Sequence, residues 1–196
     1  MSGLDLIYQR SSCHVHEMEH PAPDKQKLKR ILQSVMSAPD HGNIKPWHIV
    51  VVETEHVPTM CESMCNAWLD NAGHIDPTRV RRLTSYLKDA PMVVLVSANI
   101  AEPHAVSRRD QVLAAAAGCQ NILLAAEQEK VAAVWYSTDA AELPKVHQLF
   151  GLTEKQEPVA FIILGTKKEL RIKKRSDVAN HCYKWVGNEQ LTTLFE

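Results

Sequence analysis

The stretch MSAPDHGNIKPWHIVVVE, from Met36 to Glu53, joins the end of a predicted helix to the start of a predicted strand. A proline ends the helical pattern, and a Pro-Trp pair leads into a run of β-branched residues. Between them, Gly42 suits a turn that other residues resist. His41 and Asn43 flank this glycine, and a plain connector needs neither side chain. This loop can present both polar groups rigidly at a sheet edge, where they can contact a ligand, and the alternative is that both side chains are simply solvated.

The spacing of apolar residues predicts a domain of helices around a central sheet. Apolar residues recur every three or four positions over 2–9, 24–37, 58–72, 77–89, 108–130 and 141–149, which predicts six helices. Short apolar runs at His48–Val52, Met92–Ala98, Ala132–Ser137 and Phe161–Gly165 predict strands covered by helices on both faces. We expect one domain over residues 1–196, with a C-terminal extension from about 167 to 196 that lies on the domain or on a neighbour.

The charge balance excludes several classes of partner. The 196 residues include 22 Lys and Arg against 23 Asp and Glu, a net charge of -1, which provides no field for nucleic acid or an anionic membrane. The basic run Lys167–Arg175 has few aromatics interleaved, so it indicates a solvated edge or a phosphate clamp. The longest apolar stretch, Val112–Ala126, is too short to span a bilayer. Because the N-terminal residues contain no secretory apolar region, we expect a cytoplasmic protein.

Two classes of site are disfavoured by what the sequence lacks. It has only 7 glycines, and neither G-x-G-x-x-G nor G-x-x-x-x-G-K occurs, which argues against a dinucleotide fingerprint or a P-loop. The segment CHVHEMEH, Cys13–His20, is rich in metal-ligand types, but its spacing is irregular, so we expect no metal site. The odd count of 5 cysteines argues against a disulfide framework.

Two further polar segments are candidates for ligand binding. Arg10, Ser11 and Ser12 follow the first predicted helix and offer a guanidinium with two hydroxyls, a set that suits a phosphate ester. A serine there can equally cap the next turn. At the end of the third predicted strand, Trp135-Tyr136-Ser137 brings backbone N–H groups and aromatic rings to a cleft wall, or simply fills core.

Together and in this order, these segments resemble the FMN-dependent nitroreductase superfamily, and most closely its short bacterial NAD(P)H nitroreductase branch. The most specific piece is APDHGNIKPWHIVVV, Ala38–Val52, which is similar to the family pattern Ala-Pro-Ser/Asp-x-x-Asn-x-Gln-Pro-Trp before an apolar strand. The likeness runs from Leu4 to about Thr166 and includes FIILGT near its end. It implies an α+β, three-layer fold with a mostly antiparallel sheet of four to five strands. It also implies a homodimer with FMN at the subunit interface.

The resemblance assigns roles to particular residues. It implies that the FMN phosphate and ribityl chain contact Arg10, Ser11 and Ser12, that the loop contacts the flavin through Ser37, His41 and Asn43, and that backbone donors along the ring come from Trp135, Tyr136 and Ser137. The sequence departs from the family at Lys45, where glutamine is usual, and at Ser37, where the branch tends to carry arginine. The lost cations could be replaced by Arg171, Lys173, Lys174 or Arg175, of which we select Arg175.

The activity implied is two-electron, ping-pong transfer from NAD(P)H to a nitroaromatic, quinone or similar acceptor. The flavin carries that chemistry, so we expect no catalytic side chain. His41, Lys45 or a backbone N–H could stabilise charge on the reduced ring. Related scaffolds also support flavin destruction, dehalogenation and azoline oxidation. A flavin-binding or redox-responsive module with little turnover is the alternative, and Ala72–Leu87 are expected to line the cleft or the dimer contact.

Overall fold

A computed structural model describes residues 3–71, 77–169 and 173–195. Its helices are α1 (Gly3–Gln9), α2 (Lys25–Gln33), α3 (Val57–Asn71), α4 (Pro77–Leu87), α5 (Arg108–Gln128) and α6 (Pro144–Leu149). Its strands are β1 (Met18–Glu19), β2 (Trp47–Val52), β3 (Met92–Asn99), β4 (Val131–Tyr136), β5 (Gln156–Lys167), β6 (Tyr183–Trp185) and β7 (Leu191–Thr193). Short 3-10 turns are η1 (Val15–Glu17), η2 (Ser34–Ser37), η3 (His41–Asn43), η4 (Thr54–His56), η5 (Asp139–Glu142) and η6 (Val178–His181).

Five strands form one antiparallel sheet around β5. β3 pairs with one edge of β5 and carries β2 on its own far side, while β4 pairs with the other edge of β5. On the two edges of β5, Thr166 pairs with Glu19 of β1 and with Val131 of β4. β1 therefore lies on the same edge of β5 as β3, beyond the end of β3. This arrangement matches the mixed helix and antiparallel sheet fold expected from the sequence.

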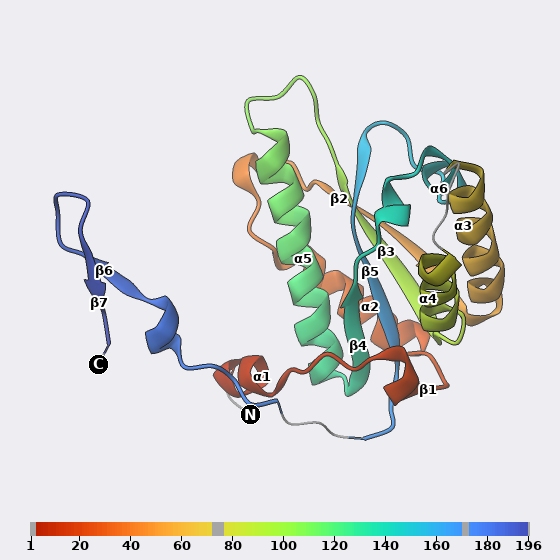
Figure 1. Cartoon of the computed structure of the whole chain (residues 1–196), viewed down its shortest axis with the longest axis horizontal. Helices are drawn as coiled ribbons and strands as arrows, with labels where there is room; N and C mark the ends of the chain where they lie inside the picture. The colour runs from red at the N-terminus through yellow and green to blue at the C-terminus, as the bar shows by residue number, and fades with distance from the viewer. Residues whose placement is uncertain (1–2, 72–76, 170–172, 196) are drawn as a thin grey trace.

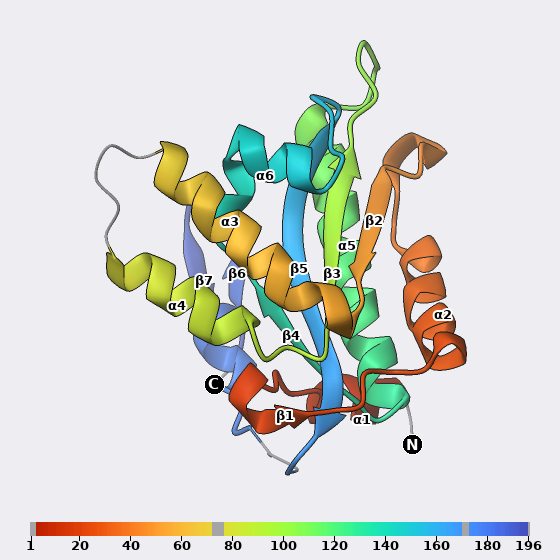
Figure 2. The ribbon, with the colours of Figure 1, turned by 90° about the vertical axis from the view of Figure 1, so that its right-hand side faces the viewer.

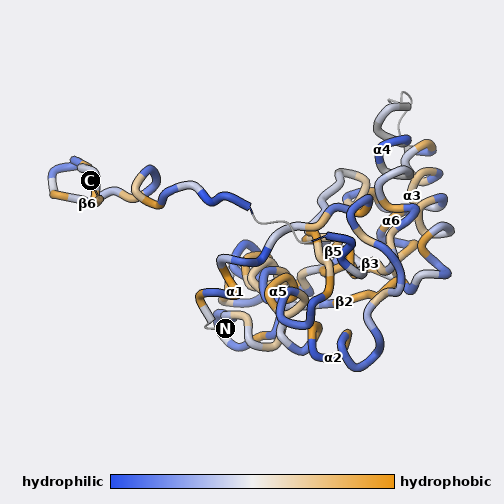
Figure 3. The backbone as a smooth tube through the Cα atoms, turned by 90° about the horizontal axis from the view of Figure 1, so that it is seen from below, coloured by the Kyte–Doolittle hydropathy of each residue, from blue (hydrophilic) through white to orange (hydrophobic). Residues whose placement is uncertain are grey.

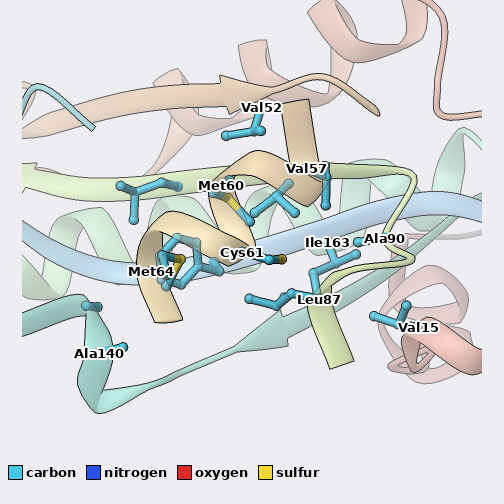
Figure 4. Packing of buried hydrophobic residues seen from close by; sticks show 14 of the residues in the cluster. Val15, Val52, Val57, Met60, Cys61, Met64, Leu87, Ala90, Ala140 and Ile163 are labelled. Carbon is cyan, nitrogen blue, oxygen red and sulfur yellow. The ribbon is translucent and has the colours of Figure 1, made fainter. Parts of the chain in front are cut away.

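The sheet is buried on both faces, which explains the unbroken apolar runs. Along β3, Val93 and Leu95 join a core cluster with α3, α4 and α6, while Val94 and Val96 join a second cluster with α2 and α5. The helices thus form one layer on each side of the sheet (Figure 1 and Figure 2). Figure 4 shows the first cluster, in which Met60, Cys61 and Met64 of α3 pack beside Leu87 and Ile163.

Capping residues fix where the helices begin. The Asp24 carboxylate accepts hydrogen bonds from the N–H groups of Gln26 and Lys27 at 2.9 and 2.8 Å, and the bond from Lys27 is the main cause of its lowered pKa. The Ser107 hydroxyl accepts from the N–H of Asp110 at 3.1 Å at the start of α5. The predicted helix 24–37 instead ends at Gln33 and continues as the 3-10 turn η2, and the predicted helix 141–149 starts only at Pro144.

The predicted strands are confirmed, but β5 is longer than the predicted Phe161–Gly165. It begins at Gln156 and ends at Lys167. The strands β1, β6 and β7 were not predicted, because two or three residues give too short a period to recognise.

The cysteines lie mostly in the two cores. Cys61 and Cys65 share the buried face of α3, as their spacing predicts, and Cys119 is buried in α5. Burial raises the pKa of Cys61 and of Cys119 to about 12, so both thiols are protonated at neutral pH. All five cysteines fall within the described part of the chain, and they form no disulfide.

The C-terminal segment leaves the body of the molecule. The β6–β7 hairpin lies far from the sheet and its helices, as Figure 1 and Figure 3 show. Its large apolar side chains are exposed, with Trp185 71% accessible. Among the described residues, no helix is both long enough and apolar enough to cross a bilayer. A cytoplasmic location remains a prediction.

Candidate functional site

The segment after α1 runs along the outer edge of β4. The N–H of Cys13 donates to the carbonyl of Ala133 at 3.0 Å, on the edge of β4 that faces away from β5. This bond holds the preceding residues beside β4, so that Ser11 is buried and Ser12 is half-buried. The Arg10 guanidinium donates to the Ser12 hydroxyl at 3.4 Å. The predicted Arg10-Ser11-Ser12 group therefore forms one local unit.

The electrostatics around Arg10 are those of a crowded cationic site. Partial burial and the nearby Arg175 lower the pKa of Arg10, while Glu127 acts in the opposite direction. The Arg175 guanidinium also donates to the Arg10 carbonyl. Arg175 is thus adjacent to Arg10, and its predicted role in binding a phosphate stays a prediction. Lys173 and Lys174 are exposed, and Arg171 lies outside the described residues.

Lys167 at the end of β5 and Lys168 just after it join the same site. Both belong to the basic run Lys167–Arg175, but neither is among the site residues predicted from the sequence. A cavity of about 230 Å³ is lined by Ser11, Ser12, Cys13, His16, Glu17, Lys167, Lys168 and Glu169. Lys167 is held by both oxygens of Glu127 at 2.7 Å. The Lys168 ammonium donates to the His16 carbonyl at 3.0 Å and keeps two further donors. The pairing of β1 with the end of β5 brings both lysines to the site, and a sequence alone does not show this pairing.

At the other end of β4 lie Trp135, Tyr136 and Ser137. The Trp135 indole N–H donates to the Ser137 hydroxyl at 3.0 Å. The Tyr136 ring stacks on Tyr86 of α4, with centroids 4.6 Å and planes 19° apart. The Tyr86 phenol in turn lies 3.1 Å from Nδ1 of His14. Tyr136 and Ser137 also line a cavity of about 560 Å³ that reaches to α3 and α4.

The loop of the Ala38–Val52 motif lies beside the start of α5. Gly42, Asn43 and Lys45 all have positive φ, at 77°, 55° and 53°. The Asp40 carboxylate accepts from the Lys45 N–H at 2.6 Å and closes the loop. Lys45 occupies the position where the family pattern has glutamine. Its backbone is in the left-handed region, which asparagine or glycine adopts more readily. His41 is 74% exposed and its Nδ1 lies 4.0 Å from an oxygen of Asp110.

A glycine in α5 lets η2 approach closely and thereby positions Ser37. A Cβ atom at Gly118 would come within 2.8 Å of a methyl carbon of Val35, so only glycine fits there without movement. Asn121 of α5 also donates to the Ser34 carbonyl at 3.0 Å. Ser37, at the end of η2, is exposed on this side of the molecule.

The structure divides the predicted site residues into two clusters. The first, here called the β4-edge cluster, comprises Arg10, Ser11, Ser12, Trp135, Tyr136, Ser137 and Arg175. The second, here called the loop cluster, comprises Ser37, His41 and Asn43. His41 contacts Asp110 in the first turn of α5, whereas Arg10 interacts with Glu127 near its end. Asp110 and Glu127 are about 25 Å apart along the helix axis at 1.5 Å per residue, so His41 and Arg10 lie near opposite ends of α5.

The histidine-rich segment forms no evident metal site. The His14 ring stacks on the His16 ring with centroids 5.8 Å apart, and the backbone N–H of His14 donates to the Glu17 carboxylate at 2.8 Å. Within the described part of the chain, no group of three or more His, Cys, Asp and Glu side chains is arranged to hold a metal ion.

Comparison with known proteins points to one family. The model of the nitroreductase family matches residues 7–166. The Escherichia coli (strain K12) protein named "Putative NAD(P)H nitroreductase YdjA" is 30% identical over 166 residues, which are 85% of this chain and 88% of that protein.

Solved structures show the same fold. A nitroreductase-like family protein from Bacillus cereus superposes with a TM-score of 0.80 at 22% identity, covering 95% of this chain and 97% of the other. A nitroreductase with bound FMN from Desulfitobacterium hafniense DCB-2 superposes with a TM-score of 0.69 at 17% identity, covering 95% and 100%. At such identities the likeness establishes the fold, which confirms the fold expected from the sequence.

Proposed function

Because the chain belongs to the nitroreductase family, we propose that it is an FMN-dependent oxidoreductase that transfers two electrons from NAD(P)H to a small-molecule acceptor. The observation that carries the proposal is the β4 edge. Hydroxyls and cations gather at one end of this edge, and Tyr136 and Ser137 line a cavity at the other. An extended molecule with a phosphate at one end and a planar ring at the other fits this polarity. The solved relative from Desulfitobacterium hafniense holds FMN.

The phosphate would be held at the Arg10 end of β4. Ser11, Ser12 and Lys168 line the cavity there, and Lys168 retains donors after its bond to His16. Charge-assisted hydrogen bonds from such cations are the strongest that a phosphate ester makes. Because Lys167 is already neutralised by Glu127, Lys168 and Arg10 would carry most of the attraction.

The flavin ring would lie at the Tyr136 end. There β4 ends and Ser137 is exposed, so its polar groups would be available to the ring's heteroatoms. The chemistry that bound FMN supplies is two-electron transfer. Overall, a hydride from NAD(P)H and a proton from water convert, for example, a quinone to a hydroquinone and leave NAD(P)⁺. The chain's residues bind and orient, and none is required as a nucleophile.

We further propose that the complete site is shared by two copies of the chain. Within one chain, Arg10 and His41 lie near opposite ends of α5, so we assign Ser37, His41 and Asn43 of each site to a second copy. Exposed apolar surface supports this assembly. Leu4 and Tyr8 of α1 are 61% and 64% accessible, and the β6–β7 hairpin carries exposed Tyr183 and Trp185. Such surface is characteristic of an interface.

The purified protein tests this proposal. We expect a yellow preparation that releases FMN on denaturation and oxidises NADH or NADPH when a quinone or a nitroaromatic is added. A protein that binds FMN but shows no acceptor-dependent oxidation would be a flavin-binding module. A colourless protein that cannot be loaded with FMN would overturn the proposal.

A further inference from the structure

The cavity of about 560 Å³ at the end of β4, here called the acceptor cavity, has room beyond the site already described. Its volume lies within the range of about 300–1,000 Å³ that small-molecule sites occupy. Tyr136 and Ser137 belong to it, so it adjoins the proposed ring position. Trp68 of α3 and Arg82 of α4 form its opposite side. Both helices lie over the same face of the sheet (Figure 2).

The floor of the acceptor cavity is an interrupted part of the sheet. β4 ends with Tyr136 opposite Phe161, so the preceding residues of β5 have no β4 neighbour. On the other edge, the pairing with β3 skips from Ala160 to Pro158 and leaves Val159 as a bulge. Pro158, Val159 and Ala160 all line the cavity. Bulges of this kind are frequent beside active sites, because they end regular pairing and re-aim side chains.

The walls combine aromatic surface with one cation. Trp68, Tyr136 and Phe161 are the aromatic residues of the lining, and Ser137 and Thr138 carry hydroxyls. The Arg82 side chain is exposed and takes part in none of the ion pairs between described residues. Glu142 lines the same cavity but is not within ion-pair distance of Arg82. A guanidinium with unused donors matches the two oxygens of a carboxylate.

We propose that the acceptor cavity binds the electron acceptor and selects planar aromatic acceptors that carry a carboxylate, with Arg82 as the residue that binds the carboxylate. This inference rests on the proposed function, since it assumes that reducing equivalents are delivered beside Tyr136 and Ser137. The aromatic walls hold the ring of the acceptor, and Arg82 determines which ring substituent is preferred.

The test compares two acceptors that share a nitroaryl ring. The first, 4-nitrobenzoate, carries a carboxylate, and the second, 4-nitrobenzyl alcohol, carries a neutral group in the same position. With FMN-loaded protein, Arg82→Gln should lower kcat/KM for 4-nitrobenzoate by about 10- to 100-fold, the loss expected for one charged hydrogen bond. The change should appear mainly in KM. The value for 4-nitrobenzyl alcohol should stay within about twofold, since it makes no charged contact.

Two further variants separate the cavity from general charge effects. Arg81→Gln removes the same charge from the neighbouring exposed position of α4, which does not line the cavity, and should leave both acceptors unchanged. Glu142→Gln removes a negative charge from the lining and should raise kcat/KM for 4-nitrobenzoate, the opposite of Arg82→Gln. Equal effects of Arg82→Gln on both acceptors, or no effect on either, would overturn the assignment.

Isothermal titration of 4-nitrobenzoate keeps this inference separate from the proposed function. Binding that is weakened by Arg82→Gln in a protein without turnover would support the cavity and refute the oxidoreductase. Efficient turnover of both acceptors, with binding that Arg82→Gln leaves unchanged, would support the oxidoreductase and refute the cavity.

Discussion

The phenol oxygen of Tyr86 lies 3.1 Å from Nδ1 of His14, a contact that joins α4 to the segment following Ser12. The same tyrosine stacks on Tyr136 at the end of β4. One side chain therefore connects the segment that follows Ser12 with the end of β4. Burial raises the pKa of Tyr86, so the phenol stays protonated and keeps its hydrogen-bonding role across neutral pH.

Replacing Tyr86 by Phe should remove the contact with His14 and leave the aromatic ring packed in place. The stack on Tyr136 is kept, whereas the contact with His14 is lost, at a cost of about 0.5–1.5 kcal/mol. We expect Tm to fall by about 2–4 °C for each kcal/mol and the Kd for FMN to rise several-fold. Thermal unfolding and flavin titration measure both.

Lys168 should recognise the phosphate and not the ring. Lys168→Gln removes a cation from the cavity shared with Ser11 and Ser12. We expect the Kd for FMN to rise about tenfold, equivalent to about 1.4 kcal/mol. The Kd for riboflavin, which lacks the phosphate, should hardly change. Lys174→Gln alters a nearby exposed lysine outside that cavity and serves as the control. A similar loss for both flavins would place the phosphate elsewhere.

Gly42 should tolerate no side chain. Its φ of +77° disfavours L-residues, and an added Cβ would lie 2.9 Å from a methyl carbon of Val106. Gly42→Ala should therefore destabilise the protein by about 1–3 kcal/mol in urea unfolding. Val106→Ala makes room for that Cβ. The double variant should thus lose less stability than the sum of the two single variants, and simple additivity would exclude a steric clash.

The cap of α2 should make stability depend on acidic pH. Hydrogen bonds from Lys27 and Gln26 lower the pKa of Asp24, so its contribution is complete above its unfolded pKa of about 3.9 and is lost as the pH falls through the lower folded value. Asp24→Ala should be less stable than the parent at pH 7, and the difference should shrink below about pH 4. A difference that is constant with pH would contradict this role of the carboxylate.

The fold was predictable where the pattern is local. Val93 to Val96 are buried on alternate faces, so their apolar run identifies a strand between two helical layers. The start of β5 was missed because Glu157 and Pro158 interrupt that pattern at the bulge. β1 has only two residues and depends on pairing with Lys167 and Thr166, which is a long-range property.

The site was predictable in part for the same reason. Arg10, Ser11 and Ser12 are adjacent in sequence and remain adjacent in space. Lys168 belongs to the basic run Lys167–Arg175, for which the sequence leaves open a solvated edge or a phosphate clamp, and it reaches the site through a tertiary contact with His16. Tyr86 reaches the site through its contact with His14, and no local signal identifies it. The positive φ of Lys45 accompanies a hydrogen bond from its backbone N–H to Asp40, which shapes the loop but does not explain why the residue is a lysine.

A heterodimer tests the shared site most directly. One copy carries Arg10→Ala and the other carries Asn43→Ala, and the two are co-expressed with different tags and purified together. If the β4-edge cluster of each copy is completed by the loop cluster of the other, one site loses both residues and the second site remains intact. We predict one FMN per heterodimer, against two for the parent and far fewer for either homodimeric variant. A heterodimer that binds no FMN would contradict the shared site, since both residues would then serve the same copy.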